Sequence, residues 1–336
     1  ELLKKGHEVL VFDNLSNSSS IALDRVKLIT NQSLKFIEGD VRDYAVLSRV
    51  MKEFVPEAVM HFAGLKAVSE SIINPLEYYD VNVRGSLEIL RAMETIACNL
   101  LIFSSSATVY GIPEYLPCDE DHPTSPINPY GRSKLMVEGL LEDWVKARGD
   151  HMAVCLRYFN PVGAHVSGLI GEDPRDIPNN LMPFVAQTAS GRREKLSIFG
   201  GDYDTRDGTG ERDYIHVSDL VNGHLLALEH HEILERFQVL NLGSGRGTTV
   251  QEFVEEFERS TNQKIKREVL GRRPGDIAIT YADTRLASRL INFRCEKSIT
   301  HMCIDTWNWQ KNNPNGYSNN TNIDSFVVTK NLSLKK

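Results

Sequence analysis

The sequence predicts an α/β fold built on a doubly wound parallel sheet, with a smaller C-terminal part. Along residues 8–158, short apolar runs of strand length alternate with longer segments whose apolar residues recur at helical spacing. The runs are nearly continuous rather than alternating, as expected for strands that helices cover on both faces. Beyond residue 160 the chain becomes rich in glycine, aspartate and proline, which predicts a substrate-binding part of different construction.

The first predicted strand, 8–13, follows a helix end that stops at Gly6 and is itself followed by Asn14. It ends in Asp13. In dinucleotide-binding sheets an acid at the end of the second strand binds the adenine ribose, after a first strand and a glycine-rich turn. No such turn precedes Asp13. The sequence therefore predicts that these residues lack a central strand and the pyrophosphate-binding turn, and bind a dinucleotide less well than a complete domain.

The remaining elements follow in order. We predict helices over residues 21–29, 44–54, 79–97 and from 129, and strands over residues 34–41, 58–64, 101–106, 152–158 and 239–243. Asp40 is placed to contact a cofactor or to cap the helix that begins near Tyr44, and we favour the first role. His61 is predicted to pack inside the sheet.

The candidate catalytic group is Tyr130 with Lys134, because residues four apart share one face of a helix. A free tyrosine has a pKa near ~10, and lowering it by ~3 takes roughly 4 kcal/mol. A neighbouring ammonium group supplies part of this, and a cationic nicotinamide ring would add more. The pair suits general-base removal of a hydroxyl proton. Ser106 ends an apolar strand, at the edge where open α/β sheets hold ligands.

Together these residues resemble the Ser…Tyr-x-x-x-Lys triad of the extended short-chain dehydrogenase/reductase family, which has a Rossmann-type sheet. Four further segments are similar to those of its UDP-glucose 4-epimerases: 61–68, 157–164, 179–183 and 210–217. The resemblance, which extends to about Tyr317, implies an isomerase of galactose metabolism that interconverts UDP-glucose and UDP-galactose. It assigns the catalytic roles to Tyr130, Lys134 and Ser106.

The resemblance also implies contacts with the cofactor and the substrate. Those for NAD are Asp13, Asn14, Asp40, Val41, Phe62, Ala63, Gly64, Lys66, Asn82, Tyr130, Lys134 and Tyr158. Those for the UDP-sugar are Ser106, Asn160, Asn180, Leu181, Phe199, Arg212, Arg273 and Asp276. The two arginines would bind the diphosphate, since guanidinium forks match phosphate oxygens. By contrast, we interpret Asp213, Tyr214 and His216 as structural.

The reaction that the resemblance implies is a cycle. Tyr130 takes the proton of the hexose 4-hydroxyl while Ser106 binds the same oxygen. The C4 hydride goes to NAD, the 4-ketose rotates while UDP stays anchored, and the hydride returns to the opposite face.

Two alternatives stay open, namely another nucleotide-sugar enzyme of the family and an inactive truncated binding module. The first would be a 4,6-dehydratase or a decarboxylase. The Asp-Glu pair of the dehydratases is absent here, where Ala107 and Thr108 follow Ser106.

Thr280 bears on the choice of sugar. It matches a position where some family members place a bulky tyrosine against the sugar's 2-position and others a small residue. A small side chain would leave room for an N-acetyl group, so we expect UDP-GlcNAc and UDP-GalNAc to be accepted as well. An alignment shifted by one residue would place Tyr281 there instead.

Composition limits the remaining possibilities. The formal net charge of -7 argues against binding to nucleic acid or to an anionic membrane. No apolar run spans a bilayer, no signal peptide is recognisable, and the five cysteines lack zinc or disulfide spacing. We therefore expect a cytoplasmic protein without a metal, and the resemblance implies a homodimer.

The resemblance also implies a domain division. We predict an NAD-binding part at 1–160 with a return at 214–245, a mainly UDP-sugar-binding part at 161–317, and a flexible tail at 318–336.

Overall fold

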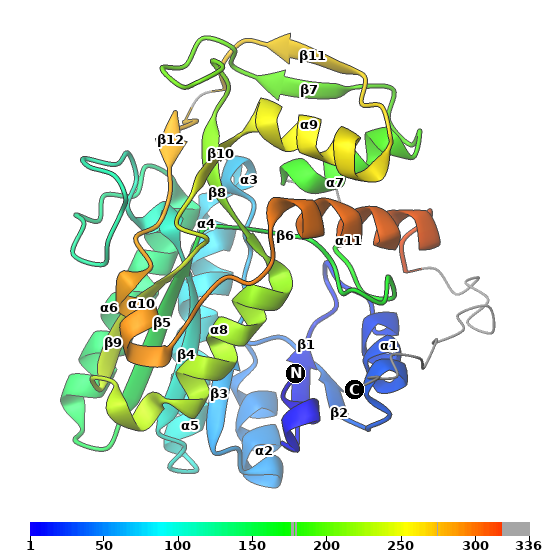
Figure 1. The fold of residues 1–336 in the computed structure, drawn as a ribbon. Coiled ribbons are helices and arrows are strands. Elements are labelled where there is room, and N and C mark those ends of the chain that lie inside the picture. Colours follow the sequence, from blue (N-terminus) through cyan, green and yellow to red (C-terminus); the bar gives the residue numbers. More distant parts are fainter. Residues whose placement is uncertain (176–177, 179, 274, 318–336) are drawn as a thin grey trace, which may run out of the picture.

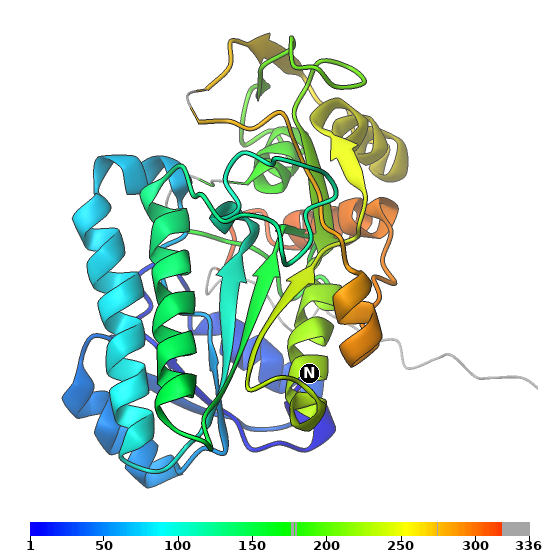
Figure 2. The same cartoon turned by 90° about the vertical axis from the view of Figure 1, so that its left-hand side faces the viewer.

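Four parallel strands form the centre of the molecule, and helices cover both faces of this sheet (Figures 1 and 2). The computed structural model describes residues 1–175, 178, 180–273 and 275–317. The predicted tail at 318–336 lies outside the described residues.

The strands are β1 (Leu10–Asp13), β2 (Lys35–Glu38), β3 (Ala58–His61), β4 (Leu100–Ser106), β5 (Met152–Tyr158), β6 (Asn160–Val162), β7 (Leu196–Phe199), β8 (Glu211–His216), β9 (Phe237–Leu242), β10 (Gly247–Thr249), β11 (Arg267–Leu270) and β12 (Ile279–Thr280). The α-helices are α1 (Ile21–Thr30), α2 (Tyr44–Phe54), α3 (Val68–Ile73), α4 (Pro75–Tyr78), α5 (Gly85–Glu94), α6 (Pro129–Ala147), α7 (Leu181–Ala189), α8 (Val217–Glu229), α9 (Val250–Thr261), α10 (Arg285–Ile291) and α11 (Ile299–Asn312). The shorter helical segments are η1 (Leu3–Lys5), η2 (Tyr79–Arg84), η3 (Ala107–Val109) and η4 (His231–Ile233), of which η2 is a π-helix and the others are 3₁₀-helices.

The central sheet has the order β3-β4-β5-β9, and all of its strands run parallel. Strand β9 enters it from far along the chain and pairs with β5, so that Arg157 faces Asn241 in the register. The doubly wound α/β fold that the sequence predicts is therefore confirmed.

Strands β1 and β2 form a separate two-stranded parallel sheet. Among the described residues neither of them pairs with β3. In the described part of the chain, β1 and β2 therefore pair only with each other and do not extend the central sheet.

Side chains alternate between the two faces of the central sheet, so each face has its own apolar core. On one face Leu101 and Phe103 of β4 pack with residues of α2, α5 and α6. On the other face Ile102 packs with residues of α8 and α10. Burial on both sides explains why these strands read as unbroken apolar runs.

The second part of the molecule is built around β8, which pairs with β10, β12 and β6, while β7 pairs with β11 (Figure 1). Helices α7, α9 and α11 pack around it, with Phe253 and Phe257 at the centre of a third apolar core. Strand β8 leads directly into α8, so one continuous segment joins this part to the central sheet. In the described part of the chain no helix combines the length and the apolar character needed to cross a membrane.

Candidate active site

Helix α6 places the predicted catalytic pair at the carboxyl end of the central sheet. Its first turn is fixed by Asn128, whose side-chain Oδ1 accepts a hydrogen bond from the Gly131 N–H at 2.8 Å, and by Pro129 at the first helical position. A Cβ at Gly131 would lie 2.8 Å from the Thr108 carbonyl oxygen. Glycine there lets α6 come close to the end of β4.

The Tyr130 side chain lies beside Ser106, the last residue of β4, near enough for the Ser106 hydroxyl group to favour the phenolate. The Ser106 oxygen also accepts hydrogen bonds from the Thr108 N–H at 3.2 Å and the Thr108 hydroxyl at 3.0 Å. Both predicted residues are buried, each 7 % exposed. The structure thus brings two hydroxyl oxygens together at the edge of the sheet, where one substrate oxygen could contact both.

Lys134 lies one turn further along α6 but does not bond the phenol. Its Nζ donates to the Ser104 carbonyl oxygen at 2.9 Å and lies 5.9 Å from the centre of the Tyr130 ring. Burial lowers the pKa of Lys134 to about 8 and raises the pKa of Tyr130 above its ordinary value. The ammonium group alone therefore does not lower the pKa of the phenol, since at this separation the loss of hydration outweighs the attraction.

The predicted adenosine contacts lie at the ends of β1 and β2. Asp13 accepts hydrogen bonds from the Leu15 N–H at 2.7 Å and the Ser18 hydroxyl at 2.8 Å. Asn14 donates to Asp40 at 3.3 Å. Val41 is buried in the core beside α5. These four predicted positions are therefore gathered at one edge of the sheet.

The Asp40 carboxylate forms an ion pair with Arg42 and does not cap a helix. Its carboxylate bonds the Arg42 guanidinium group at 2.8 and 3.0 Å, which keeps the Asp40 pKa well below its usual range. The residue that caps α2 is Asp43, whose side chain accepts from the Val46 N–H. The capping role weighed for Asp40 is wrong, because the turn at 40–43 brings Asp43 to the helix start.

Four predicted cofactor residues follow β3: Phe62, Ala63, Gly64 and Lys66. The Phe62 ring is 55 % exposed and lies 4.8 Å from the ring of His224. A Cβ at Gly64 would lie 2.8 Å from Asn82 Oδ1, so the turn there requires glycine. Lys66 pairs with Glu172 at 3.1 Å.

Asn82 holds this turn in place. Its Oδ1 accepts from the Leu65 N–H at 2.7 Å, and its Nδ2 donates to the Leu65 carbonyl at 3.0 Å and to Ser133 at 2.9 Å. Asn82 therefore links the turn after β3 to helix α6. His61 is buried within the sheet and bonds Ser86 at 2.8 Å, so its predicted packing role is confirmed.

Arg212 is a predicted phosphate ligand whose guanidinium group bonds backbone oxygens. Its Nη1 donates to the carbonyl oxygens of Glu211 at 3.0 Å and Ala278 at 3.2 Å. Within the described ranges no carboxylate forms an ion pair with it, although Asp276 and Tyr214 interact with its charge at longer range. A partly buried cation without a close counter-ion favours an anionic ligand.

Arg273 lies over the Phe199 ring, 4.6 Å from its centre, and pairs with Asp276 at 3.0 Å. Asn180 precedes α7 and donates to Glu172 at 3.1 Å, and Leu181 packs against the core of the second part. The remaining two predicted positions lie at the end of the sheet: Tyr158 ends β5, where its ring lies 6.1 Å from that of His224, and Asn160 begins β6.

The three residues interpreted as structural have structural partners. Asp213 is buried and accepts hydrogen bonds from the N–H groups of Ser244, Gly245 and Ala282 at 2.7, 2.9 and 3.1 Å. Tyr214 packs on Phe253, and His216 caps α8. That interpretation is confirmed.

Two acidic residues near the site were not predicted from the sequence. Glu172 contacts both Lys66 and Asn180, and therefore joins the predicted cofactor and substrate sides. Glu138 continues the four-residue spacing of Tyr130 and Lys134, a signal that was present in the sequence but not used. Among the described residues no cluster of three or more His, Cys, Asp or Glu side chains could hold a metal ion.

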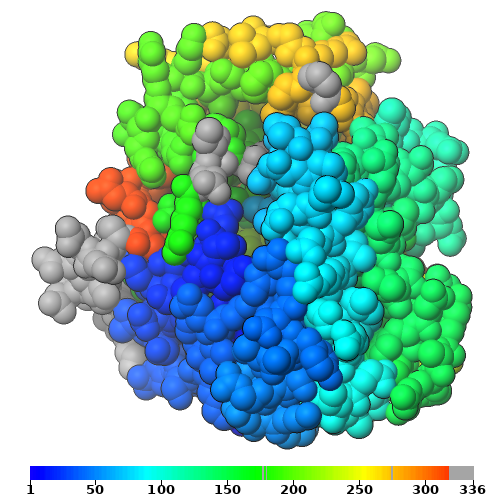
Figure 3. Space-filling model, turned by 180° about the vertical axis from the view of Figure 1, so that it is seen from behind, coloured from blue at the N-terminus to red at the C-terminus, as the bar shows by residue number. Residues whose placement is uncertain are grey.

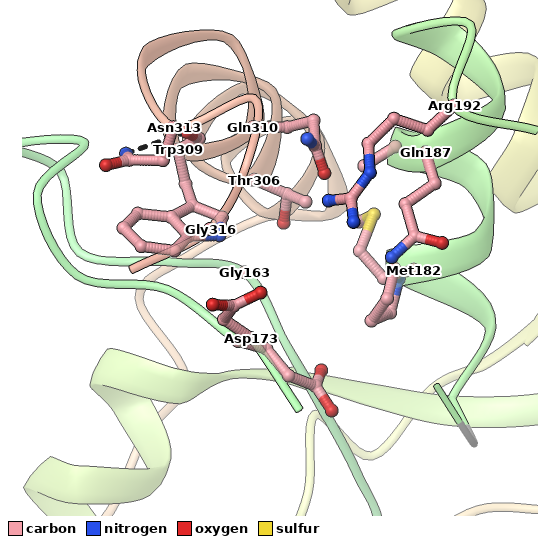
Figure 4. A pocket seen from close by; sticks show the side chains of 13 residues that line it. Gly163, Asp173, Met182, Gln187, Arg192, Thr306, Trp309, Gln310, Asn313 and Gly316 are labelled. Atoms are coloured by element: carbon pink, nitrogen blue, oxygen red, sulfur yellow. Dashed lines mark hydrogen bonds between the residues drawn. The ribbon is translucent and has the colours of Figure 1, made fainter. Parts of the chain in front are cut away.

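A separate cavity lies between α7, α11 and the segment around Gly163 (Figure 4). None of the predicted site residues lines it. Thr306 Oγ1 and Gln310 Nε2, two of its polar atoms, have no hydrogen-bond partner in the described part of the chain.

Comparison with known proteins gives a consistent result. The model of the "NAD dependent epimerase/dehydratase family" matches residues 1–243. The chain is 51% identical over 318 residues to UDP-glucose 4-epimerase of Haemophilus influenzae, covering 94% of each chain. It is 48% identical over 329 residues to UDP-glucose 4-epimerase 2 of Arabidopsis thaliana, covering 97% of this chain and 94% of that protein.

A solved structure is similar over the same length. It is the UDP-glucose 4-epimerase of Bifidobacterium longum in complex with NAD+ and UDP, with a TM-score of 0.90, 47% sequence identity and 94% of each chain covered.

Proposed function

Because the chain belongs to the NAD dependent epimerase/dehydratase family, we propose that it is an isomerase that interconverts UDP-glucose and UDP-galactose. The observation that carries this proposal is the position of Tyr130 beside Ser106 at the end of β4, with Lys134 one turn further along α6. Relatives with this activity in their names are 48% and 51% identical over almost the whole chain.

In this proposal Tyr130 is the general base for the sugar 4-hydroxyl. Ser106 would bond the same sugar oxygen and orient it toward the phenol. Lys134 would hold positive charge near the phenolate, with its ammonium group fixed by the Ser104 carbonyl. Because burial raises the pKa of Tyr130, the base becomes effective only when further positive charge is bound nearby.

The residues present fit NAD as the source of that charge. Acidic side chains stand at the ends of β1 and β2, an exposed Phe62 follows β3, and the Gly64 turn has room for no side chain. NAD, when bound, accepts a hydride from the sugar and returns it. We assign the adenosine end to Asp13, Asn14, Asp40 and Val41. The assignments toward the nicotinamide end are Phe62, Ala63, Gly64, Lys66, Asn82, Tyr130, Lys134 and Tyr158.

The UDP group would bind between the two parts of the chain. We assign the diphosphate to Arg212 and Arg273, because guanidinium forks match phosphate oxygens. Asp276 holds the Arg273 guanidinium group over the Phe199 ring. The flat face of the Phe199 ring therefore lies next to a positive charge. We assign the rest of the nucleotide sugar to Asn160, Asn180, Leu181, Phe199 and Asp276. Anchoring by the nucleotide leaves the hexose free to turn over in the pocket while its 4-oxygen returns to Tyr130.

The test is direct assay of the purified chain. Incubation with UDP-galactose and NAD is expected to yield UDP-glucose, resolved by anion-exchange chromatography, and the same mixture of the two from either starting sugar. A 4-keto-6-deoxy sugar would indicate a dehydratase, and release of CO2 with a UDP-pentose from UDP-glucuronic acid in a parallel assay would indicate a decarboxylase. Binding of UDP-galactose without any product would identify a binding module, and each of these results contradicts the proposal.

A second substrate class is favoured by Thr280. This short residue lies on β12 and pairs with Arg212 in the register with β8. A pocket wall made by threonine leaves more room than one made by tyrosine. We propose that UDP-GlcNAc and UDP-GalNAc are also interconverted.

We also propose that the enzyme is a cytoplasmic homodimer. Val83, Leu87, Met136 and Leu140 line a shallow hollow where η2 and α5 lie beside α6 on the outside of the sheet (Figure 3). The Met136 side chain is 54 % exposed and that of Leu87 is 43 %. In a dimer with a two-fold axis, this face of one copy would pack against the same face of the other copy. Free thiols at all five cysteines fit a reducing compartment.

The domain division is likewise a proposal. We assign residues 1–160, with a return at 214–245, to the cofactor, and residues 161–317 mainly to the nucleotide sugar. Strand β9, which joins the central sheet from within that return, supports it.

A further inference from the structure

Helix α6 lies beside the central sheet (Figure 2), and three of its residues, spaced one turn apart, contact β4. Tyr130 and Lys134 are the first two, and Glu138 is the third. The Ser105 hydroxyl donates to Glu138 Oε1 at 2.5 Å. Glu138 is 3 % exposed, so its carboxylate is held entirely by protein groups.

Glu138 also forms a buried ion pair with Arg157 on β5. Arg157 Nη2 lies 2.6 Å from Oε2 and Nε lies 3.0 Å from Oε1, which is a two-pronged contact. Ser105, Arg157 and Asn241 are neighbours across β4, β5 and β9 in the sheet register. Tyr110 completes the group, because its hydroxyl receives a hydrogen bond from Arg157 Nη1 at 3.3 Å and donates to Asn241 Oδ1 at 2.7 Å.

A buried ion pair of this kind adds little net stability, because the cost of removing two charges from water offsets their attraction. An apolar pair of the same volume would hold α6 against the sheet about as well. Unlike an apolar pair, the ion pair makes directional contacts that fix the rotation of α6 about its axis. It also places a negative charge one turn from Lys134.

We propose that Glu138 is a positioning residue for the catalytic pair. Its contacts with Arg157 and Ser105 fix α6 on the sheet so that Tyr130 meets Ser106, and its carboxylate stands one turn along α6 from Lys134. The inference rests on the proposed function for the roles of Tyr130 and Lys134, and it assigns Glu138 no contact with substrate.

The charges around Lys134 are few. Burial lowers its pKa to about 8, and the Glu138 carboxylate acts in the opposite direction. From the other elements, Tyr130 and His61 face it, and burial lowers the pKa of His61 to about 3, so that this ring is neutral at working pH. Arg157 lies beyond Glu138. Removing the Glu138 charge should therefore leave Lys134 with less support for its protonated form.

The experiment compares Glu138→Gln with the unchanged full chain. The pKa of Lys134 is measured without ligands by NMR titration of its side-chain nitrogen, and is expected to fall by about one pH unit. In the epimerase assay, kcat is expected to fall about 10-fold with KM nearly unchanged. The alkaline limb of the pH profile should move to lower pH by the same amount as the pKa of Lys134.

Three further variants make the result decisive. Glu142→Gln, one turn further along α6 and paired with Lys146 at the surface, is the matched control and should change none of these values. Arg157→Lys keeps the charge but loses the two-pronged contact, and should lower kcat without moving the pKa of Lys134. Ser105→Ala removes one hydrogen bond without a change of charge and serves if Glu138→Gln does not fold.

The inference is overturned if Glu138→Gln loses only thermal stability while the pKa of Lys134 and the pH profile stay as in the unchanged chain. When Glu138→Gln does not fold, an unchanged kcat in Ser105→Ala overturns it equally. A full chain without epimerase activity would overturn the proposed function instead, and the Lys134 titration would still decide the electrostatic role of Glu138.

Discussion

Tyr130, in the first turn of α6, lies beside Ser106, the last residue of β4. The two residues come from different elements, and the close approach of α6 at Gly131 brings them together. This relationship locates the chemistry on the carboxyl edge of the sheet, and the first prediction follows from it.

Tyr130→Phe should lower kcat for the interconversion of UDP-galactose and UDP-glucose by at least ~10²-fold, because the general base is lost. KM should stay within about 3-fold, since the nucleotide rather than the hexose would supply most of the binding. Steady-state kinetics of both sugars measure the two constants. Near-normal turnover by a folded Tyr130→Phe chain would rule out the assignment.

Activity should fall as the pH rises through about 8. Below that value Lys134 carries its proton and supports the phenolate, and above it the neutral amine does not, because burial has lowered the Lys134 pKa to about 8. Initial rates at saturating UDP-galactose from about pH 6 to 10 measure this limb. Lys134→Met should be slow at every pH and lack the limb, and a limb retained in that variant would assign it to another group.

Thr280→Tyr should abolish turnover of UDP-GlcNAc while leaving that of UDP-glucose within about 3-fold, because a bulky ring would fill the space beside the sugar's 2-position. The two substrates are compared through kcat/KM. Thr280→Val, which keeps the volume, is the control. Equal losses on both sugars would show that position 280 does not face the N-acetyl group.

Arg25→Met should destabilise the folded chain by about 2–3 kcal/mol. The Arg25 guanidinium group is buried, donates to the Leu169 carbonyl at 2.8 Å and to Asn313 at 2.7 Å, and lies over the rings of Trp309 and Tyr317. Its removal leaves buried acceptors without donors. Urea unfolding measures the loss. The exposed Arg49 on α2 supplies the control, and a loss just as large in Arg49→Met would refute the explanation.

Met136→Glu should convert the proposed dimer to a monomer, because the change places a charge in the centre of the apolar hollow beside α5. Light scattering after gel filtration measures the mass. Ile233→Glu, at an exposed site on η4, should leave the mass unchanged. A Met136→Glu chain that keeps the mass of the dimer would place the interface elsewhere.

Local patterns in the sequence were sufficient for the central sheet. Strands such as β4 and β5 are buried on both faces, and that burial demands an unbroken apolar run that can be read directly. The Tyr130–Lys134 spacing was equally readable, because helix geometry alone places both residues on one face.

The features that could not be predicted depend on contacts between distant segments. Arg157 reads as one charged residue in an apolar strand, and only the register of β5 with β4 and β9 places it among Ser105, Asn241 and Glu138. Likewise, nothing in the order of residues 40–43 decides whether Asp40 or Asp43 caps α2. The return of Arg42 onto Asp40 settles that choice in three dimensions.

The π-helical segment η2 lies between α4 and α5, and it carries the buried Asn82 that holds the turn after β3. A π-turn contains one residue more than an α-turn. Deleting a single residue from 79–84 would relax the segment to an ordinary helix, and Asn82 would lose the position from which it holds the turn after β3. At this place the chain should therefore tolerate exchange of an exposed side chain far better than any change in its length.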